Sequence, residues 1–172
     1  MTRSPKLYRT ILLGAFAFLV ASSALADSPD EKRAKIDAKA DEALQELFAA
    51  NAGAKELHGQ AYGWAVFDNL KIAFGISGGG GSGVAVSTAG ERTYMKMGTG
   101  GIGLGIGGQK YQVIFLFQNE STFRSFVDEG WQAGASAQAA AGEAGAGAGA
   151  AFHNGLALYQ MTEEGLMASA DI

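Results

Sequence analysis

The sequence contains no cysteine. Disulfides, thiol nucleophiles and cysteine-ligated zinc clusters are therefore excluded. Histidine is also scarce: His58 and His153 are the two present, and neither belongs to a recognisable nucleophile or metal motif. We interpret both as surface or strand-end residues. No catalytic residue, cofactor site or metal site is predicted, and we expect a protein that is not an enzyme.

Positive charge is the second shortage. The chain carries 13 basic and 17 acidic residues, which gives a net charge of −4. A nucleic-acid-binding protein needs a basic face, so nucleic acid is not expected as a partner.

Long hydrophobic runs are missing too. The apolar run Ile11–Val20 is short of the roughly 20 residues that a spanning helix needs. It follows the basic residues Arg3, Lys6 and Arg9 and precedes Ala24-Leu25-Ala26, which fits an A-x-A cleavage site. The pattern predicts a signal peptide over residues 1–26.

Cleavage near Ala26 would leave one domain, residues 27–172, in the periplasm or outside the cell. Removing the three N-terminal cations leaves 13 − 3 = 10 basic residues against 17 acidic ones, so the net charge falls to 10 − 17 = −7. Such a balance weakens attraction to anionic lipid overall, but a local basic patch can still act inside a negative protein.

Two segments have the periodicity of helices. Over about residues 30–50, apolar side chains recur at three- and four-residue spacing, which predicts an amphipathic helix docked on the core. Its stripe consists of Ile36, Ala40, Ala43, Leu44, Leu47 and Phe48. A shorter helix is predicted over Asn119–Val127, with Asn119 or Ser121 as its cap and Gly130 as its end.

The rest of the chain, a strand-rich core over about residues 62–172, consists of short apolar runs separated by glycine or turn residues. A turn is predicted at Asp68-Asn69. The predicted strands are Tyr62–Phe67, Lys71–Ser77, Gly83–Thr88, Thr93–Met97, Gly101–Gly107, Tyr111–Gln118, Leu156–Met161 and Gly165–Ala170. This order predicts an α+β fold with a glycine-rich antiparallel sheet, curved or barrel-like.

The glycines need their own explanation because Gly98–Gly103 and Gly78–Gly83 both fit the pattern GxGxxG. A dinucleotide-binding loop requires a helix directly after the glycines, whereas a strand pattern follows here each time. Nucleotide is therefore not expected as a ligand. Since Ile102, Leu104 and Ile106 alternate with glycine, we interpret the glycines as architectural, allowing close approach or a sharp bend of the sheet. The Ala/Gly run near 137–151 is a possible packing partner.

Three blocks, in order, resemble the SYLF domain. They are "GWAVFDNLKIAFGISGGGGSGV" (63–84), "GIGLGIGGQKYQVIFLFQNESTFRSF" (101–126) and "GAGAAFHNGLALYQMTEEGLMASADI" (147–172). The SYLF domain is a lipid-binding module, also known for actin binding in fungi. The resemblance covers roughly 35–172 and implies a non-enzymatic protein that binds phospholipid or a membrane surface peripherally.

Four cations are candidates for contact with lipid headgroups: Lys71, Arg92, Lys96 and Lys110. Each lies at a predicted strand end or turn among glycine segments, whose free amides can form anion-binding concavities. The alternative hypothesis is a structural protein of the cell envelope that self-associates through its glycine-rich sheets. The silk-like Ala/Gly alternation is the feature that favours this alternative.

Overall fold

The computed structural model describes residues 27–74, 76–101, 106–130, 151–162 and 165–166. Two compact units are distinguished, Met1–Lys32 and Arg33–Ile172, and the second contains the sheet. The helices are α1 (Pro29–Ala50), α2 (Ala52–Gln60) and α3 (Glu120–Glu129). The strands are β1 (Gly63–Phe74), β2 (Ile76–Ser87), β3 (Arg92–Gly101), β4 (Ile106–Phe117), β5 (Leu156–Thr162) and β6 (Gly165–Leu166). The predicted signal peptide lies outside the described residues.

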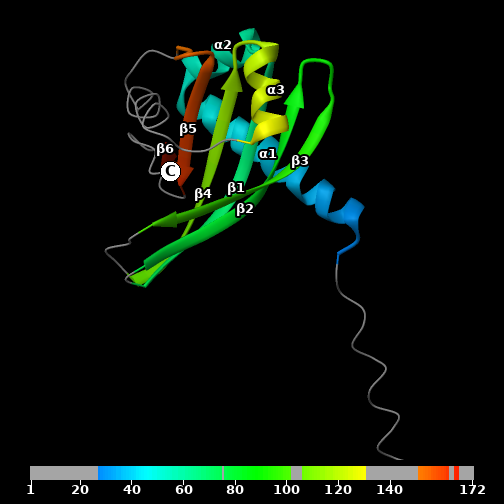
Figure 1. Cartoon of the computed structure of the whole chain (residues 1–172). Helices are drawn as coiled ribbons and strands as arrows, with labels where there is room; N and C mark the ends of the chain where they lie inside the picture. Colours follow the sequence, from blue (N-terminus) through cyan, green and yellow to red (C-terminus); the bar gives the residue numbers. More distant parts are fainter. Residues whose placement is uncertain (1–26, 75, 102–105, 131–150, 163–164, 167–172) are drawn as a thin grey trace, which may run out of the picture. The chain divides into compact units, whose positions relative to one another are not determined.

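The strands form one antiparallel sheet in the order β3-β2-β1-β4-β5-β6 (Figure 1). β1 lies at its centre and pairs along its whole length with β2 on one side and β4 on the other. The predicted antiparallel α+β fold is confirmed. Within the described residues the sheet is open, with β3 and β6 as its two edges, and is not a closed barrel.

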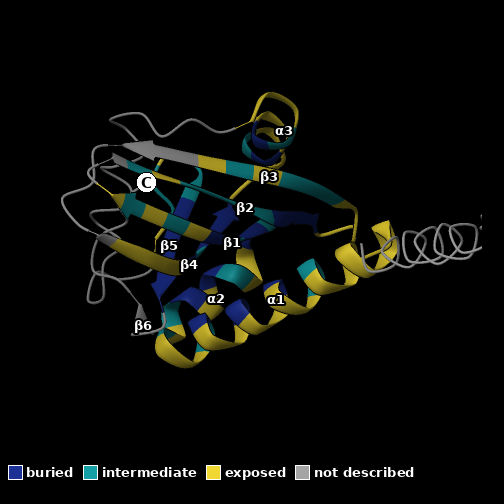
Figure 2. Ribbon diagram, turned by 90° about the horizontal axis from the view of Figure 1, so that it is seen from below, coloured by how far each residue is buried: buried dark blue, intermediate teal, exposed yellow. Residues whose placement is uncertain are grey.

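Helices cover both faces of the sheet. α1 and α2 lie on one face and α3 lies on the other (Figure 2). Alternate side chains of each strand point to opposite faces, so the sheet contributes to two separate cores. One contains Val66, Ile114 and Tyr159 with the helices α1 and α2, and the other contains Phe67 and Phe115 with α3.

The predicted stripe of α1 is buried as expected. Ala40, Ala43, Leu44 and Leu47 are buried, and Ile36 and Phe48 pack against the same core. A second helix, α2, was not predicted. It begins at the N-cap Asn51, whose side-chain oxygen accepts a hydrogen bond from the Ala54 amide, and it docks through Ala54 and Leu57.

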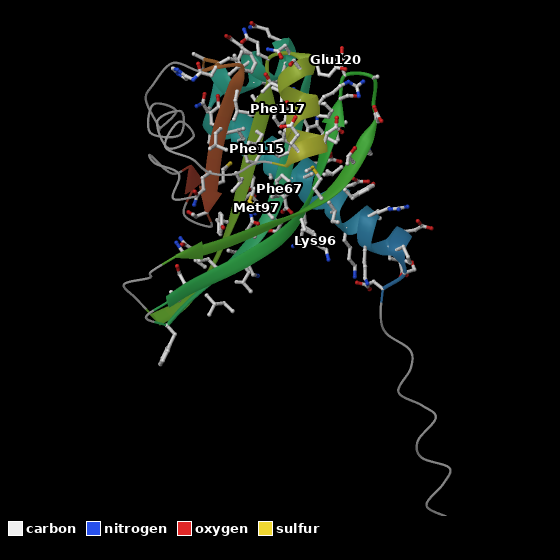
Figure 3. All side chains as sticks on the ribbon, in the orientation of Figure 1. Phe67, Lys96, Met97, Phe115, Phe117 and Glu120 are labelled. Carbon is white, nitrogen blue, oxygen red and sulfur yellow. The ribbon has the colours of Figure 1, made fainter. Side chains whose placement is uncertain are left out.

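On the opposite face, α3 closes a core made of phenylalanines. Phe67, Phe115 and Phe117, labelled in Figure 3, belong to the same core as Phe123 and Phe126 of α3. The ring centroids of Phe117 and Phe126 are 4.8 Å apart, and those of Phe115 and Phe126 are 4.9 Å apart. Asn119 caps this helix as predicted, accepting a hydrogen bond from the Thr122 amide at 2.9 Å.

The prediction of a turn at Asp68-Asn69 is wrong, because β1 continues through both residues. Asp68 is opposite Ser82 and Gln112, and Asn69 is opposite Gly81 and Tyr111, so both are paired on both sides. β1 ends only at Phe74, and β2 begins at Ile76. The glycines of 78–83 are therefore strand residues, paired with β1 and β3.

Other strand predictions agree in part. The predicted strand Leu156–Met161 corresponds to β5. In the predicted strand Gly101–Gly107, residues 102–105 lie outside the described residues, with Gly101 at the end of β3 and Ile106 at the start of β4. The end of the predicted strand Gly165–Ala170 and most of the Ala/Gly run also lie outside them.

Candidate functional site

The sheet extends beyond the helices α2 and α3 at one end (Figure 1). We call this part the distal end and define it as residues 70–74 of β1, 76–82 of β2, 96–101 of β3 and 106–110 of β4. The exposure pattern of β1 shows the change directly. Its first five residues are mostly buried, whereas the last five alternate between exposed and partly exposed.

Three large apolar side chains are exposed on the distal end. The exposed fraction increases along β1, from 44% for Leu70 to 58% for Ile72 and 75% for Phe74. The three residues are two positions apart, so they project from the same face, which is the face that carries Val66 and the helices α1 and α2. We call Leu70, Ile72 and Phe74 the apolar ridge.

Glycines flank the apolar ridge on both neighbouring strands. Leu70 is opposite Gly80 of β2, and Ile72 lies between Gly78 of β2 and Gly108 of β4. Directly opposed residues of antiparallel strands project from the same face. Ile72 therefore has glycine opposite it on both strands, and Leu70 has glycine opposite it on β2, so no side chain from those positions covers either residue although β1 is the central strand.

The register also places the predicted lysines. Lys110 is opposite Leu70 and so lies on the ridge face. Lys96, labelled in Figure 3, is opposite Ser82, which is opposite Asp68, and so projects from the same face. Lys71 lies within the ridge sequence but points to the other face. The structure thus brings Lys71, Lys96 and Lys110 to the distal end, with Lys96 and Lys110 on the ridge face.

Arg92 is separate from these lysines. It begins β3 at the other end of that strand, where its Nη1 donates to Asp37 Oδ1 of α1 at 2.8 Å. Tyr94 Oη donates to the second carboxylate oxygen at 2.9 Å, and the Arg33 guanidinium lies 5.4 Å from the centroid of the Tyr94 ring. Burial, together with the Asp37 carboxylate, raises the pKa of Tyr94. This geometry assigns Arg92 to the docking of α1.

Carboxylates are rare in this part of the chain. Between Asp68 and Glu120 the sequence has one acidic residue, Glu91. Glu91 precedes β3 at the end away from the ridge, and Asp68, just before the ridge, forms an ion pair with Lys39 of α1. The distal end therefore carries three lysines and no acidic side chain, in a chain whose net charge is negative.

His58 differs from expectation, whereas His153 lies at a strand end as predicted. His58 belongs to α2 and is partly buried, with its ring 5.0 Å from that of Phe48 and 6.3 Å from that of Trp64. Its Nε2 is buried without a hydrogen-bond partner, and burial lowers the pKa of His58. Its surroundings are therefore those of a packed core histidine. His153 lies in an isolated β-bridge to Leu156, before β5.

Two further properties of the described residues concern metal ions and membrane spans. Across the described ranges, no three or more metal-ligating side chains are grouped in a way that could hold an ion. In the same part of the chain, no helix has the combined length and apolar character that crossing a membrane requires.

The apolar ridge was missed by sequence reasoning. Apolar alternation normally indicates a strand face that is buried, and nothing in the local sequence distinguishes Ile72 from Val66. The sequence feature that could have indicated an exposed ridge is the four-glycine run at 78–81. It becomes informative only when the pairing of β1 with β2 is known, because that pairing places Gly78 and Gly80 opposite Ile72 and Leu70.

Comparison with known proteins agrees with the resemblance noted above. Residues 98–172 match the model of the family described as Ysc84, Las17-binding protein actin regulator. The chain is also 41% identical over 143 residues to Beta cell expansion factor A of Aeromonas veronii. That alignment covers 83% of this chain and 55% of the relative, so the chain spans about half the length of this curated relative.

Proposed function

Because the chain is a member of the Ysc84, or SYLF-domain, family, we propose that it binds the surface of anionic phospholipid membranes peripherally, without catalysing a reaction. The observation that carries the proposal is the distal end, where Lys71, Lys96 and Lys110 lie together without a carboxylate. An exported protein would not meet cytoplasmic actin, so lipid is the partner proposed.

The electrostatic argument is local. Although the net charge of the whole chain is −4, a charge acts in water mainly within a Debye length, about 8–10 Å at physiological ionic strength. The acidic side chains of α1 lie on a different element, and Asp37 and Asp68 are already paired with Arg92 and Lys39. A phosphate surface facing the distal end would therefore meet lysines first.

Vesicle flotation tests this proposal. We expect residues 27–172 to float with vesicles of mixed phosphatidylcholine and phosphatidylglycerol and to bind less to phosphatidylcholine alone. Each lysine near an anionic surface contributes about 1 kcal/mol. The double variant Lys96→Gln/Lys110→Gln should therefore bind about ten- to thirtyfold more weakly.

The matched control removes the same charge elsewhere. Lys55 of α2 and Arg124 of α3 are exposed on helices, so Lys55→Gln/Arg124→Gln should leave binding close to that of the wild type. Arg92→Gln should also leave binding intact, since Arg92 is engaged by Asp37. Equal losses in the distal and control variants would mean that net charge, and not the distal end, determines binding.

Localisation is a separate part of the proposal. The basic segment, apolar run and A-x-A site of residues 1–26 support export to the periplasm or the medium. Mass spectrometry of the N-terminus of the protein recovered from the producing cell tests it, with Asp27 as the expected first residue.

A further inference from the structure

The exposed apolar side chains of the ridge are not explained by electrostatic binding. Lysines alone would suffice to hold a protein at an anionic surface, yet Leu70, Ile72 and Phe74 expose apolar surface to water beside them. Exposed large side chains of this kind, grouped and bordered by polar groups, mark an interaction surface. The question is what covers them.

The geometry restricts the occupant to one that needs little area. A stable interface between two protein copies buries about 800 Å² on each partner, whereas this ridge consists of three side chains, with glycine opposite Leu70 and Ile72 on β2. A symmetric pair of copies that covered this ridge would also bring the ridge-face lysines of both copies, Lys96 and Lys110, into one interface. A lipid bilayer needs no minimum contact area of this kind and brings no second set of lysines. An anionic bilayer also complements the charge of the lysines.

The direction of β1 gives the ridge a depth order. Four residues of a strand span about 13 Å, and exposure increases from Leu70 to Phe74. Lys110 is opposite Leu70, at the start of the ridge, and a lysine can keep its ammonium group at the headgroups while its stem lies among apolar groups. Phe74 would then be deepest and Lys110 would lie at the interface.

We infer that the apolar ridge inserts into the hydrocarbon region of the bilayer, with Phe74 deepest, Ile72 next and Leu70 nearest the headgroups. This inference rests on the proposed membrane binding and adds its mode: the distal end of the sheet enters, and the helices stay outside. Binding then has an apolar component that persists when salt screens the lysines.

The chain offers a direct test because it contains no cysteine. Single variants Leu70→Cys, Ile72→Cys and Phe74→Cys are labelled with an environment-sensitive fluorophore, and Ser125→Cys on the exposed side of α3 is the control. With vesicles that carry a quencher at a shallow or a deep acyl position, we expect deep quenching to be strongest at 74 and weakest at 70. The label at 125 should stay in water.

A second test needs no label. Phe74→Ser should weaken partition into anionic vesicles about tenfold, and Ile72→Ser/Phe74→Ser about a hundredfold, since full burial of such a side chain corresponds to roughly one to two powers of ten in a partition constant. Gly78→Ser is the control: it is opposite Ile72, has no atom within 4 Å of a new Cβ, and adds no apolar surface. The loss should persist at about 1 M salt, where the Debye length is about 3 Å.

The possible results distinguish a failure of the insertion inference from a failure of the proposed membrane binding. If the wild type floats but the labels at 72 and 74 remain in water and Phe74→Ser floats equally, the insertion is wrong and headgroup binding stands. If the wild type does not float, both fail. If the wild type sediments as a dimer that Phe74→Ser dissociates, the ridge is a contact between copies and the inference is overturned.

Discussion

Replacing Gly83 with alanine tests whether the glycines of β2 are there for close approach. A Cβ at this position would lie 2.6 Å from Cδ1 and 2.7 Å from Cγ of Phe67 and would collide with the carbonyl oxygen of Val66. Neither neighbour is free to move. Val66 belongs to the paired central strand, and the Phe67 ring is fully buried against Phe115 and Phe126 at centroid distances of 6.0 and 6.1 Å.

The magnitude follows from two opposing effects. Overpacking a well-packed core costs about 1–3 kcal/mol, and two rigid neighbours place this site in the upper part of that range. Alanine also lowers the conformational entropy of the unfolded chain, which stabilises by about 0.4–1 kcal/mol. We therefore expect Gly83→Ala to reduce the free energy of unfolding by about 1–2.5 kcal/mol.

Gly78 of the same strand is the matched control. No atom lies within 4 Å of a Cβ built there, and its backbone is not in the left-handed region. Gly78→Ala should therefore be neutral or stabilise by up to about 1 kcal/mol. Urea unfolding followed by circular dichroism, with equal m-values, gives both numbers. Equal effects of the two substitutions would refute the reasoning that close approach, and not glycine content, decides where glycine is required.

Three further predictions concern the helices. Leu47→Ala removes a fully buried side chain of α1 and should lower the free energy of unfolding by about 2–5 kcal/mol in urea titrations; a loss under 1 kcal/mol would mean that α1 does not dock as described. Asp37→Ala should lower it by about 1 kcal/mol through the loss of the Arg92 and Tyr94 contacts, with the exposed Asp41→Ala as control, and equal losses would contradict the assignment of Arg92. Because burial lowers the pKa of His58 below its ordinary 6.5, the unfolded chain binds that proton first, so stability should fall as pH decreases from about 6.5; urea unfolding of His58→Gln should show a smaller decrease, and an identical pH dependence would count against this role.

The parts of the fold that could be predicted are those with a strong local pattern. The stripe of α1, the Asn119 cap of α3 and the strand β5 all follow from spacing and cap chemistry. Helix α2 was missed because Gly53 and Gly59 weaken a short helix, and only its packing through Ala54 and Leu57 compensates. The prediction of a turn at Asp68-Asn69 is wrong because it rests on residue type alone. In the structure, hydrogen bonding to β2 and β4 on either side keeps both residues in the extended strand β1.

The candidate site shows the same limit. Residue type alone grouped Lys71, Lys96, Lys110 and Arg92. The structure places Arg92 at the other end of β3 from Lys96, in an ion pair with Asp37, 55 positions away in sequence. The apolar ridge could not be predicted either, because its exposure also depends on elements that are distant in sequence. Whether Phe74 is buried depends on how far α1 and α2 reach along the sheet, and that length is a property of the assembled layers.

The continuity of β1 has a mechanical consequence. One strand of 12 residues contains both the buried Ala65–Phe67 segment and the apolar ridge, and it is hydrogen-bonded along its length to β2 and β4. A force applied at Phe74 along the strand axis would load both ladders in shear, so that many hydrogen bonds resist at the same time. If the apolar ridge inserts as inferred above, this anchor would hold the domain against lateral drag or curvature stress without a separate linker to stretch.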